Sequence, residues 1–307
     1  MHRRAFLTSA LAAGLFPALT GTRHTRAPNR AMFVSLNSSL TRRMAWLDFA
    51  KLAASTGYGG VDVDLAGART QGAADTRTLL RTLQIAPGAV GLPVNFAGDD
   101  ATFESGLAKL EDAAVFAATI GCPRMIAVLP PSSTTPKPEF RALLKTRITA
   151  IAKVLEPAGL RLGLEFLGPL HFRTRNPHEF IWRMPETLDF CTDCGANVGV
   201  LLDAWHWHHA GATASDIITA GKARIVHIHV SDAKAQPPED VRDNQRLFPG
   251  EGVIDLVTFF QALKKIGYTD AISPEPLGRV PAEMPAEEGA RLGLKTTTDV
   301  MKKAGVL

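Results

Sequence analysis

The chain has 307 residues, which is enough for one large domain or two small ones. Apolar residues make up 46 % and charged residues 21 %, a composition that excludes a disordered polypeptide and allows a sizeable core. The formal net charge is +4, but residues 1–26 hold four arginines and no acidic residue, so the remainder is close to neutral. That remainder has no run rich in Lys and Arg, and we therefore expect no nucleic-acid partner.

The N-terminal segment has the features of an export signal. Arg3 and Arg4 are followed by Ala5-Phe6-Leu7 and by an apolar run over residues 10–19. Such a run is too short to span a membrane, which needs about 20 residues. The paired arginines followed by Phe and Leu resemble a twin-arginine signal. We expect residues 1–26 to be a cleaved signal segment and the mature protein to be periplasmic, without stable membrane insertion. An ordinary signal peptide or an amphipathic N-terminus stays open.

From residue 31 onward, short apolar strands alternate with stretches of helical periodicity. The predicted strands are Met32–Ser38, Gly60–Leu65, Pro87–Leu92, Met125–Leu129, Arg161–Leu167, Val198–Ala204, Ile225–Val230 and Ala271–Glu275. The predicted helices are Met44–Ser55, Asp75–Leu83, Phe103–Ile120, Glu139–Leu155, Pro185–Cys194, Ala214–Ala220, Val253–Lys265 and Ala282–Lys302.

Eight strand–helix units indicate a parallel sheet, and eight units over about 275 residues are typical of a closed (β/α)8 TIM barrel. An open doubly wound sheet would normally carry a glycine-rich turn after its first strand, and residues 35–39 have no glycine. No linker or shift in composition divides the chain. We therefore expect an α/β fold with one barrel domain over residues 31–307.

The three cysteines exclude a four-cysteine zinc site, because Cys191 and Cys194 form the one C-x-x-C in the chain. Both lie late in a predicted helix. They can be small buried side chains or, in an oxidising compartment, a disulfide. Both alternatives stay open.

Metal-capable side chains end four successive predicted strands. They are Glu165, Asp203, His229 and Glu275, on the fifth to the eighth strand. The C-terminal ends of barrel strands meet at one mouth, where the active site of such a barrel lies. Three carboxylates close together would repel one another, and a divalent cation would neutralise them. The oxygen-rich set favours Mn²⁺ or Mg²⁺, with Co²⁺ or Zn²⁺ as alternatives.

Four motifs of the second half carry a resemblance to a known family. They read Asp203-Ala204-Trp205-His206, His227-Ile228-His229-Val230-Ser231-Asp232, Pro249-Gly250-Glu251-Gly252 and Pro274-Glu275. Together with Gly163-Leu164-Glu165, they resemble the xylose-isomerase-like barrels of the sugar isomerase and epimerase kind. The resemblance covers the chain from about residue 31 to its end.

The resemblance implies that Glu165, Asp203, His229 and Glu275 bind one metal ion and that Glu165 and Glu275 also act as catalytic acid and base. It implies a substrate-binding or supporting position for His206. Ketohexose 3-epimerases of this kind carry an Arg six residues after the metal-binding His, and Ala235 stands there in this chain. They also carry a Glu six residues after the first metal-binding Glu, where this chain has His171, which is a further candidate for substrate contact.

Further candidates for substrate contact come from the residues themselves. Arg242 and Arg246 lie in the long charged stretch before Pro249 and are candidates to replace the missing Arg. Trp205 could stack on a sugar ring. Polar residues of the first half, such as Asn37, Asp64 and Asn95, are candidates for the sugar pocket that the sequence alone cannot rank.

Together these features predict a metal-dependent isomerase or epimerase acting on a sugar, keto-sugar or cyclitol through proton abstraction beside a carbonyl and a metal-bound enediolate. A dehydratase or β-eliminating lyase acting on a 3-keto-glycoside or inosose begins with the same step and stays open. A sugar-binding barrel without catalysis is the third alternative. A trinuclear zinc nuclease is excluded, because no histidine lies between His24 and His171. The partner is expected to be a small-molecule sugar, and a homo-oligomer stays open.

Overall fold

The computed structural model describes residues 31–41 and 44–307. Residues 31–307 form one compact unit. The predicted signal segment, residues 1–26, lies outside the described residues. Export therefore remains a prediction.

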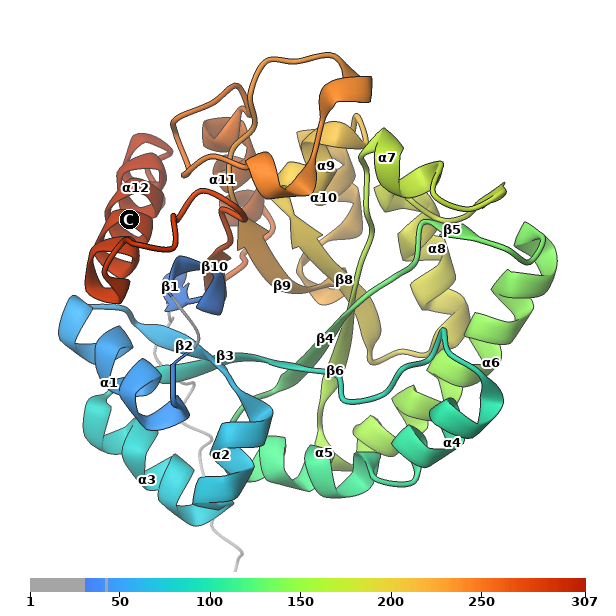
Figure 1. Cartoon of the computed structure of the whole chain (residues 1–307), viewed down its shortest axis with the longest axis horizontal. Coiled ribbons are helices and arrows are strands. Elements are labelled where there is room, and N and C mark those ends of the chain that lie inside the picture. Colours follow the sequence, from blue (N-terminus) through green and yellow to red (C-terminus); the bar gives the residue numbers. More distant parts are fainter. Residues whose placement is uncertain (1–30, 42–43) are drawn as a thin grey trace, which may run out of the picture. The chain divides into compact units, whose positions relative to one another are not determined.

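Eight parallel strands close into a barrel in the order β1-β10-β9-β8-β6-β4-β3-β2 (Figure 1). Their bounds are β1 Phe33–Leu36, β2 Gly60–Val63, β3 Ala86–Gly91, β4 Arg124–Val128, β6 Arg161–Glu165, β8 Val198–Asp203, β9 Ile225–Val230 and β10 Ala271–Pro274. A separate antiparallel pair consists of β5 Ser132–Ser133 and β7 His178–Glu179. All eight predicted barrel strands are present, and the predicted fold class is confirmed.

Helices surround the barrel strands (Figure 1). Their bounds are α1 Trp46–Thr56, α2 Leu65–Gln71, α3 Ala73–Leu83, α4 Asp100–Leu107, α5 Leu110–Thr119, α6 Lys137–Leu155, α7 Leu170–Arg173, α8 Met184–Cys194, α9 Ala204–His209, α10 Ala214–Ala220, α11 Leu256–Lys265 and α12 Ala286–Lys303. Their apolar faces pack on the strands, as with Phe259 and Phe260 of α11, which are fully buried.

Several helix predictions were wrong in detail, and the helix expected to begin at Ala282, for example, begins at Ala286. The single helix expected over residues 103–120 is divided into α4 and α5. Gly106, a poor helix former, lies in the last turn of α4 and leaves room for Val94. The helix expected to begin at Val253 begins at Leu256, because the Asp255 side chain accepts a hydrogen bond from Thr258 N and caps it.

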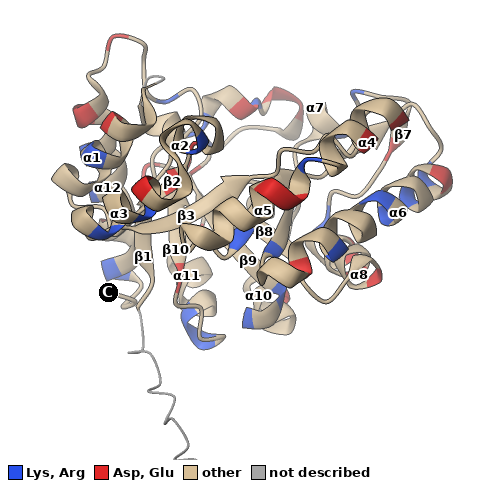
Figure 2. Cartoon of the chain, turned by 90° about the horizontal axis from the view of Figure 1, so that it is seen from below, with Lys and Arg blue, Asp and Glu red and all other residues tan. Residues whose placement is uncertain are grey.

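The cysteines are buried and carry free thiols. Burial raises the pKa of Cys194 to about 12, so it behaves as a small core side chain. Within the described part of the chain, every helix is too short or too polar to cross a membrane. Basic and acidic residues are interspersed over the outer helices (Figure 2).

Candidate active site

The four predicted metal ligands meet at the C-terminal end of the barrel. Glu165 ends β6, Asp203 ends β8, His229 lies one residue before the end of β9, and Glu275 directly follows β10. One ligand atom from each of these side chains lies within 4.8 Å of the ligand atoms of the other three. Parallel strands end at the same mouth, so residues that are 110 positions apart become neighbours.

Local structure fixes the Asp203 carboxylate. Asp203 caps α9, because its Oδ1 accepts a hydrogen bond of 2.7 Å from Trp205 N. Its Oδ2 is 2.7 Å from Arg246 Nη1 inside the site. The helix cap therefore occupies Oδ1 of Asp203 and leaves Oδ2 for the site. Because the cap fixes the carboxylate, it also sets the direction in which Oδ2 points.

His229 lies between the two glutamates. Its Nδ1 is 3.5 Å from Glu165 Oε1 and 3.3 Å from Glu275 Oε2. Burial lowers the pKa of His229, but the adjoining Glu275 and Glu165 carboxylates outweigh it and hold the pKa well above its usual value. Burial raises the pKa of Glu165 to about 7, although His229 opposes the rise. Burial also raises the pKa of Asp203, but Arg246 outweighs it and brings the pKa to about 2.

The donor set fits a divalent cation. Glu165 Oε1 and His229 Nδ1 are buried, and among the described residues they have no partners apart from their 3.5 Å contact with each other and the 3.3 Å contact of Nδ1 with Glu275 Oε2. Such buried polar atoms are costly unless something binds them. A site of carboxylate oxygens and one imidazole suits Mn²⁺, Mg²⁺, Co²⁺ or Zn²⁺.

Arg246 inserts its guanidinium group into the same site. The residue is 2 % exposed, and its Nη1 donates to Asp203 Oδ2 at 2.7 Å and to Glu275 Oε2 at 3.2 Å. Asp243 Oδ1 accepts from Arg246 Nε at 2.9 Å and from Nη2 at 2.7 Å. The one guanidinium faces three carboxylates here, and Glu165 adds a fourth acidic group, so negative charge remains in excess.

Pairing of the neighbouring backbone positions Arg246 in the site. The next residue, Leu247, exchanges two backbone hydrogen bonds with Asp232, just beyond β9. The Asp232 carboxylate in turn accepts from four backbone N–H groups, those of Ala233, Gly250, Gly252 and Ile254. A Cβ at Gly252 would overlap the carbonyl oxygen of Ala233, so the turn requires glycine there. Asp232 thus holds the loop that carries Arg246.

His206 and Trp205 pack against Arg246. Its Nη2 is 3.2 Å from His206 Nε2, and burial lowers the pKa of His206 well below its usual value, so this ring accepts the hydrogen bond in its neutral form. The Arg246 guanidinium also lies 4.6 Å from the centre of the Trp205 ring. Trp205 is 2 % exposed, so stacking on a sugar would require Arg246 to move away from that ring face.

The other two predicted substrate residues lie outside this cluster. His171 lies on α7, where its ring is 4.1 Å from the ring of Phe172. Arg242 is exposed and donates to the carbonyl oxygens of Glu239 and Val241 in its own loop. The structure therefore separates the two arginine candidates, and Arg246 is the one that reaches the candidate ligands.

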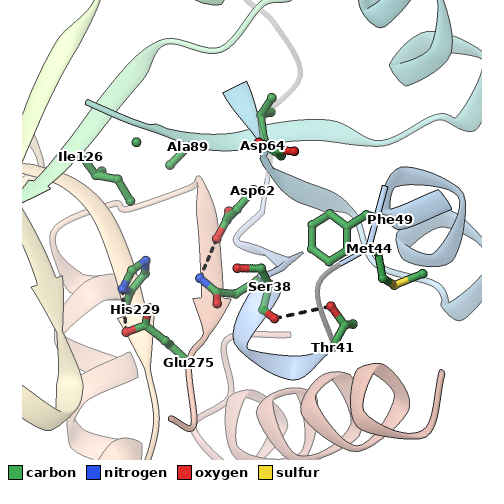
Figure 3. Close-up of a pocket in the computed structure, with 13 residues that line it drawn as sticks. Ser38, Thr41, Met44, Phe49, Asp62, Asp64, Ala89, Ile126, His229 and Glu275 are labelled. Carbon is green, nitrogen blue, oxygen red and sulfur yellow. Dashed lines mark hydrogen bonds and ion pairs between the residues drawn. The ribbon is translucent and has the colours of Figure 1, made fainter. Parts of the chain in front are cut away.

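A cavity of about 380 Å³ adjoins His229 and Glu275 and extends toward β1, β2 and β3 (Figure 3). Asn37 and Asp64, two candidates from the sequence, line this cavity. The residue that the sequence analysis missed is Asp62, which lines it too. The sequence gives one indication of Asp62: an acidic residue stands between two valines in the middle of a strand.

Asp62 belongs to a hydrogen-bonded network inside the barrel. Its carboxylate accepts from Ser35 Oγ at 2.8 Å, from Ser273 Oγ at 2.9 Å and from Asn37 Nδ2 at 3.1 Å. Burial raises the pKa of Asp62, while His229 and these three donors oppose the rise. Because all three of these groups donate a hydrogen bond to the carboxylate, they stabilise its unprotonated form.

The same network bears on a second group of metal-capable residues, formed by Asp62, His227 and His229. Ser273 gives its hydroxyl proton to Asp62, so it can only accept at its 3.0 Å contact with His227 Nε2. His227 Nε2 therefore carries a hydrogen, and a metal could bind this residue through Nδ1 alone. The cluster of Glu165 and its neighbours offers four ligands against three and is the better metal site.

Comparison with known proteins places the chain in a family. Residues 50–299 match the model of the xylose isomerase-like TIM barrel. An inosose isomerase from Bacillus subtilis (strain 168) is 31 % identical over 186 residues, which are 60 % of this chain and 65 % of that protein. A D-psicose 3-epimerase from Enterocloster bolteae is 26 % identical over 137 residues, 44 % of this chain and 40 % of that protein. The chain thus spans less than two thirds of the length of either relative.

A solved structure gives the same assignment over more of the chain. The xylose isomerase domain protein from Alicyclobacillus acidocaldarius has a TM-score of 0.83 and 31 % identity, and the match covers 90 % of this chain and 100 % of that one. The chain belongs to the xylose isomerase-like TIM barrel family.

Proposed function

We propose that this protein is an isomerase or epimerase that depends on one divalent metal ion and acts on a sugar, keto-sugar or cyclitol. The observation that carries the proposal is the convergence of Glu165, Asp203, His229 and Glu275 within 4.8 Å of one another at the mouth of the barrel. The similarity to an inosose isomerase and a D-psicose 3-epimerase supports a substrate of this class.

The positions of the two glutamates support a role in acid–base chemistry. Glu165 and Glu275 come from different strands, and a carboxylate oxygen of each lies within 3.5 Å of His229 Nδ1. One carboxylate takes a proton from the carbon beside a carbonyl, and the other returns a proton from the opposite face, which inverts that carbon. When bound, a divalent cation would stabilise the negative charge that develops during this transfer. Arg246 and the cap of α9 hold Asp203 and Glu275 in position.

We further propose that Mn²⁺ is the preferred metal of this site. We also propose that the protein is exported to the periplasm by its twin-arginine-like segment, residues 1–26. Replacing Arg3 and Arg4 with Lys should stop export of a reporter fused after residue 30. Unchanged export would contradict the twin-arginine proposal.

The test of the activity is proton–deuterium exchange. The metal-loaded protein is incubated in D₂O with an inosose and with D-psicose, and exchange at carbon-bound hydrogens is followed by NMR. Glu165→Gln and Glu275→Gln should lower exchange by about 10²- to 10⁴-fold, the usual contribution of an acid or base. Glu283→Gln, at an exposed position, is the control and should exchange at the wild-type rate.

Product analysis separates isomerisation from elimination. An isomerase or epimerase yields a product of the same mass as its substrate, whereas a β-eliminating lyase releases water or an alcohol. If the wild-type protein gives neither exchange nor product with keto-sugars, the proposed activity is wrong.

A further inference from the structure

The cavity beside the candidate metal site has chemistry that the proposed reaction does not use. Its volume of about 380 Å³ is at the lower end of the range for ligand pockets, so it suits a small molecule. His229 and Glu275 lie at one side of it, and Asn37, Asp62 and Asp64 supply further polar groups. Apolar side chains, among them Phe49, complete the lining (Figure 3).

The Asp62 carboxylate is held by three hydrogen bonds and can still accept a further one. Oδ1 accepts from two serine hydroxyls, whereas Oδ2 accepts from Asn37 Nδ2 alone. A carboxylate oxygen has room for two donors, so Oδ2 can accept one more. On the neighbouring strand, a Cβ at Gly88 would overlap Ser35 Oγ and Asp62 Oδ1. The interior of the barrel is therefore shaped around this carboxylate.

His229 supplies a second unsatisfied group nearby. The residue is 4 % exposed, and its Nε2 has no hydrogen-bond partner among the described residues. A ring nitrogen of His229 lies within 4.8 Å of a carboxylate oxygen of Asp62. Figure 3 shows the second ring nitrogen of His229, away from Glu275, on the side of Asp62. Two hydrogen bonds of about 2.8 Å each can meet at one oxygen across such a gap.

We propose that Asp62 and His229 together bind one hydroxyl group of a polyol substrate. This hydroxyl group donates to the Asp62 carboxylate and accepts from the His229 ring. The inference rests on the proposed function, because it places the substrate's hydroxyls in the cavity next to the reacting carbon. The described lining residues include Asp62, Asp64 and Glu275, so acceptors for hydroxyl groups line the cavity.

The experiment measures binding without turnover. The probe is myo-inositol, an uncharged polyol without a carbonyl, and its dissociation constant is measured by calorimetry on the metal-loaded protein. Asp62→Asn removes the charge that strengthens the hydrogen bond and should weaken binding about tenfold. Asp189→Asn is the matched control, because it makes the same change at an exposed position on α8, outside the cavity. It should change the dissociation constant less than threefold.

A series of monodeoxy inositols tests the same contact on the wild-type protein. One of them should bind about tenfold more weakly than myo-inositol, and Asp62→Asn should not distinguish the two. The inference would be overturned if all monodeoxy inositols had the same dissociation constant as myo-inositol. It would also be overturned if wild type and Asp62→Asn bound myo-inositol equally. The series decides the matter even if Asp62→Asn does not fold.

The two proposals fail in different ways. A wild-type protein that exchanges the protons of keto-sugars but binds every deoxy analogue alike refutes the hydroxyl contact alone. A protein that binds myo-inositol through Asp62 but takes up no metal and exchanges nothing refutes the proposed activity alone.

Discussion

Replacing Arg246 with Met tests how the site balances its charge. Asp203 is fully buried and loses its cation in this variant, while Glu275 loses one of its partners. Breaking a buried pair costs about 3–5 kcal/mol, because an uncompensated charge stays behind. In the metal-free protein, Arg246→Met should therefore lower the free energy of unfolding by about this amount, or the melting temperature by roughly 6–20 °C.

A bound divalent cation should remove most of that loss. It would neutralise Asp203 and Glu275, and only the pair with Asp243 would stay broken. The Asp243 side chain is 31 % exposed, so that pair should contribute about 1 kcal/mol or less. By linkage, the variant should bind the metal more tightly than wild type by about 2–4 kcal/mol, or roughly 30- to 1,000-fold.

Urea unfolding of wild type and variant, with EDTA and with excess Mn²⁺, measures all four free energies. Arg279→Met is the control, since the Arg279 side chain is 42 % exposed, and it should change stability by about 1 kcal/mol or less under both conditions. A loss in Arg246→Met that is the same with and without Mn²⁺ would refute the view that Arg246 and the metal neutralise the same carboxylates.

Three other perturbations test the surroundings of the site. Gly88→Ala should destabilise the protein by about 1–3 kcal/mol, because the new methyl group overlaps the Asp62 carboxylate, whereas Gly91→Ala, with open space around its Cβ, should cost less than 1 kcal/mol in the same urea assay. Asp232→Ala should cost at least about 3 kcal/mol, since four backbone N–H groups lose their acceptor, and an unchanged melting temperature would contradict this. Metal uptake should release protons and weaken as the pH falls, because the neighbouring carboxylates hold the pKa of His229 well above its usual value and a metal ligand must be unprotonated. A binding enthalpy that is the same in buffers of different ionisation enthalpy would contradict this prediction.

The fold could be predicted because each strand–helix unit has its own local pattern. Runs such as residues 198–202 carry no polar side chain, as expected for strands buried on both faces. The errors lie where tertiary contacts decide. Periodicity continues through residues 103–120, and only the packing of Gly106 against Val94 accompanies the division between α4 and α5.

The candidate ligands could be predicted because the ends of parallel strands must converge. Asp62 could not be ranked in the same way, since its importance depends on Ser35, Asn37 and Ser273, which come from other parts of the chain. The insertion of Arg246 depends on the backbone pairing between Leu247 and Asp232, which no local pattern in the sequence encodes. Side chains that meet through loops thus require the structure.

The most direct test of the central claim is the metal content of the purified protein, measured by elemental analysis beside Glu165→Gln and Asp203→Asn. We predict about one Mn, Mg, Co or Zn per wild-type chain and much less in both variants, with the fold of each checked by circular dichroism. A wild-type protein that contains no metal, and takes up none when Mn²⁺ is added, would contradict the account and favour a sugar-binding barrel without catalysis.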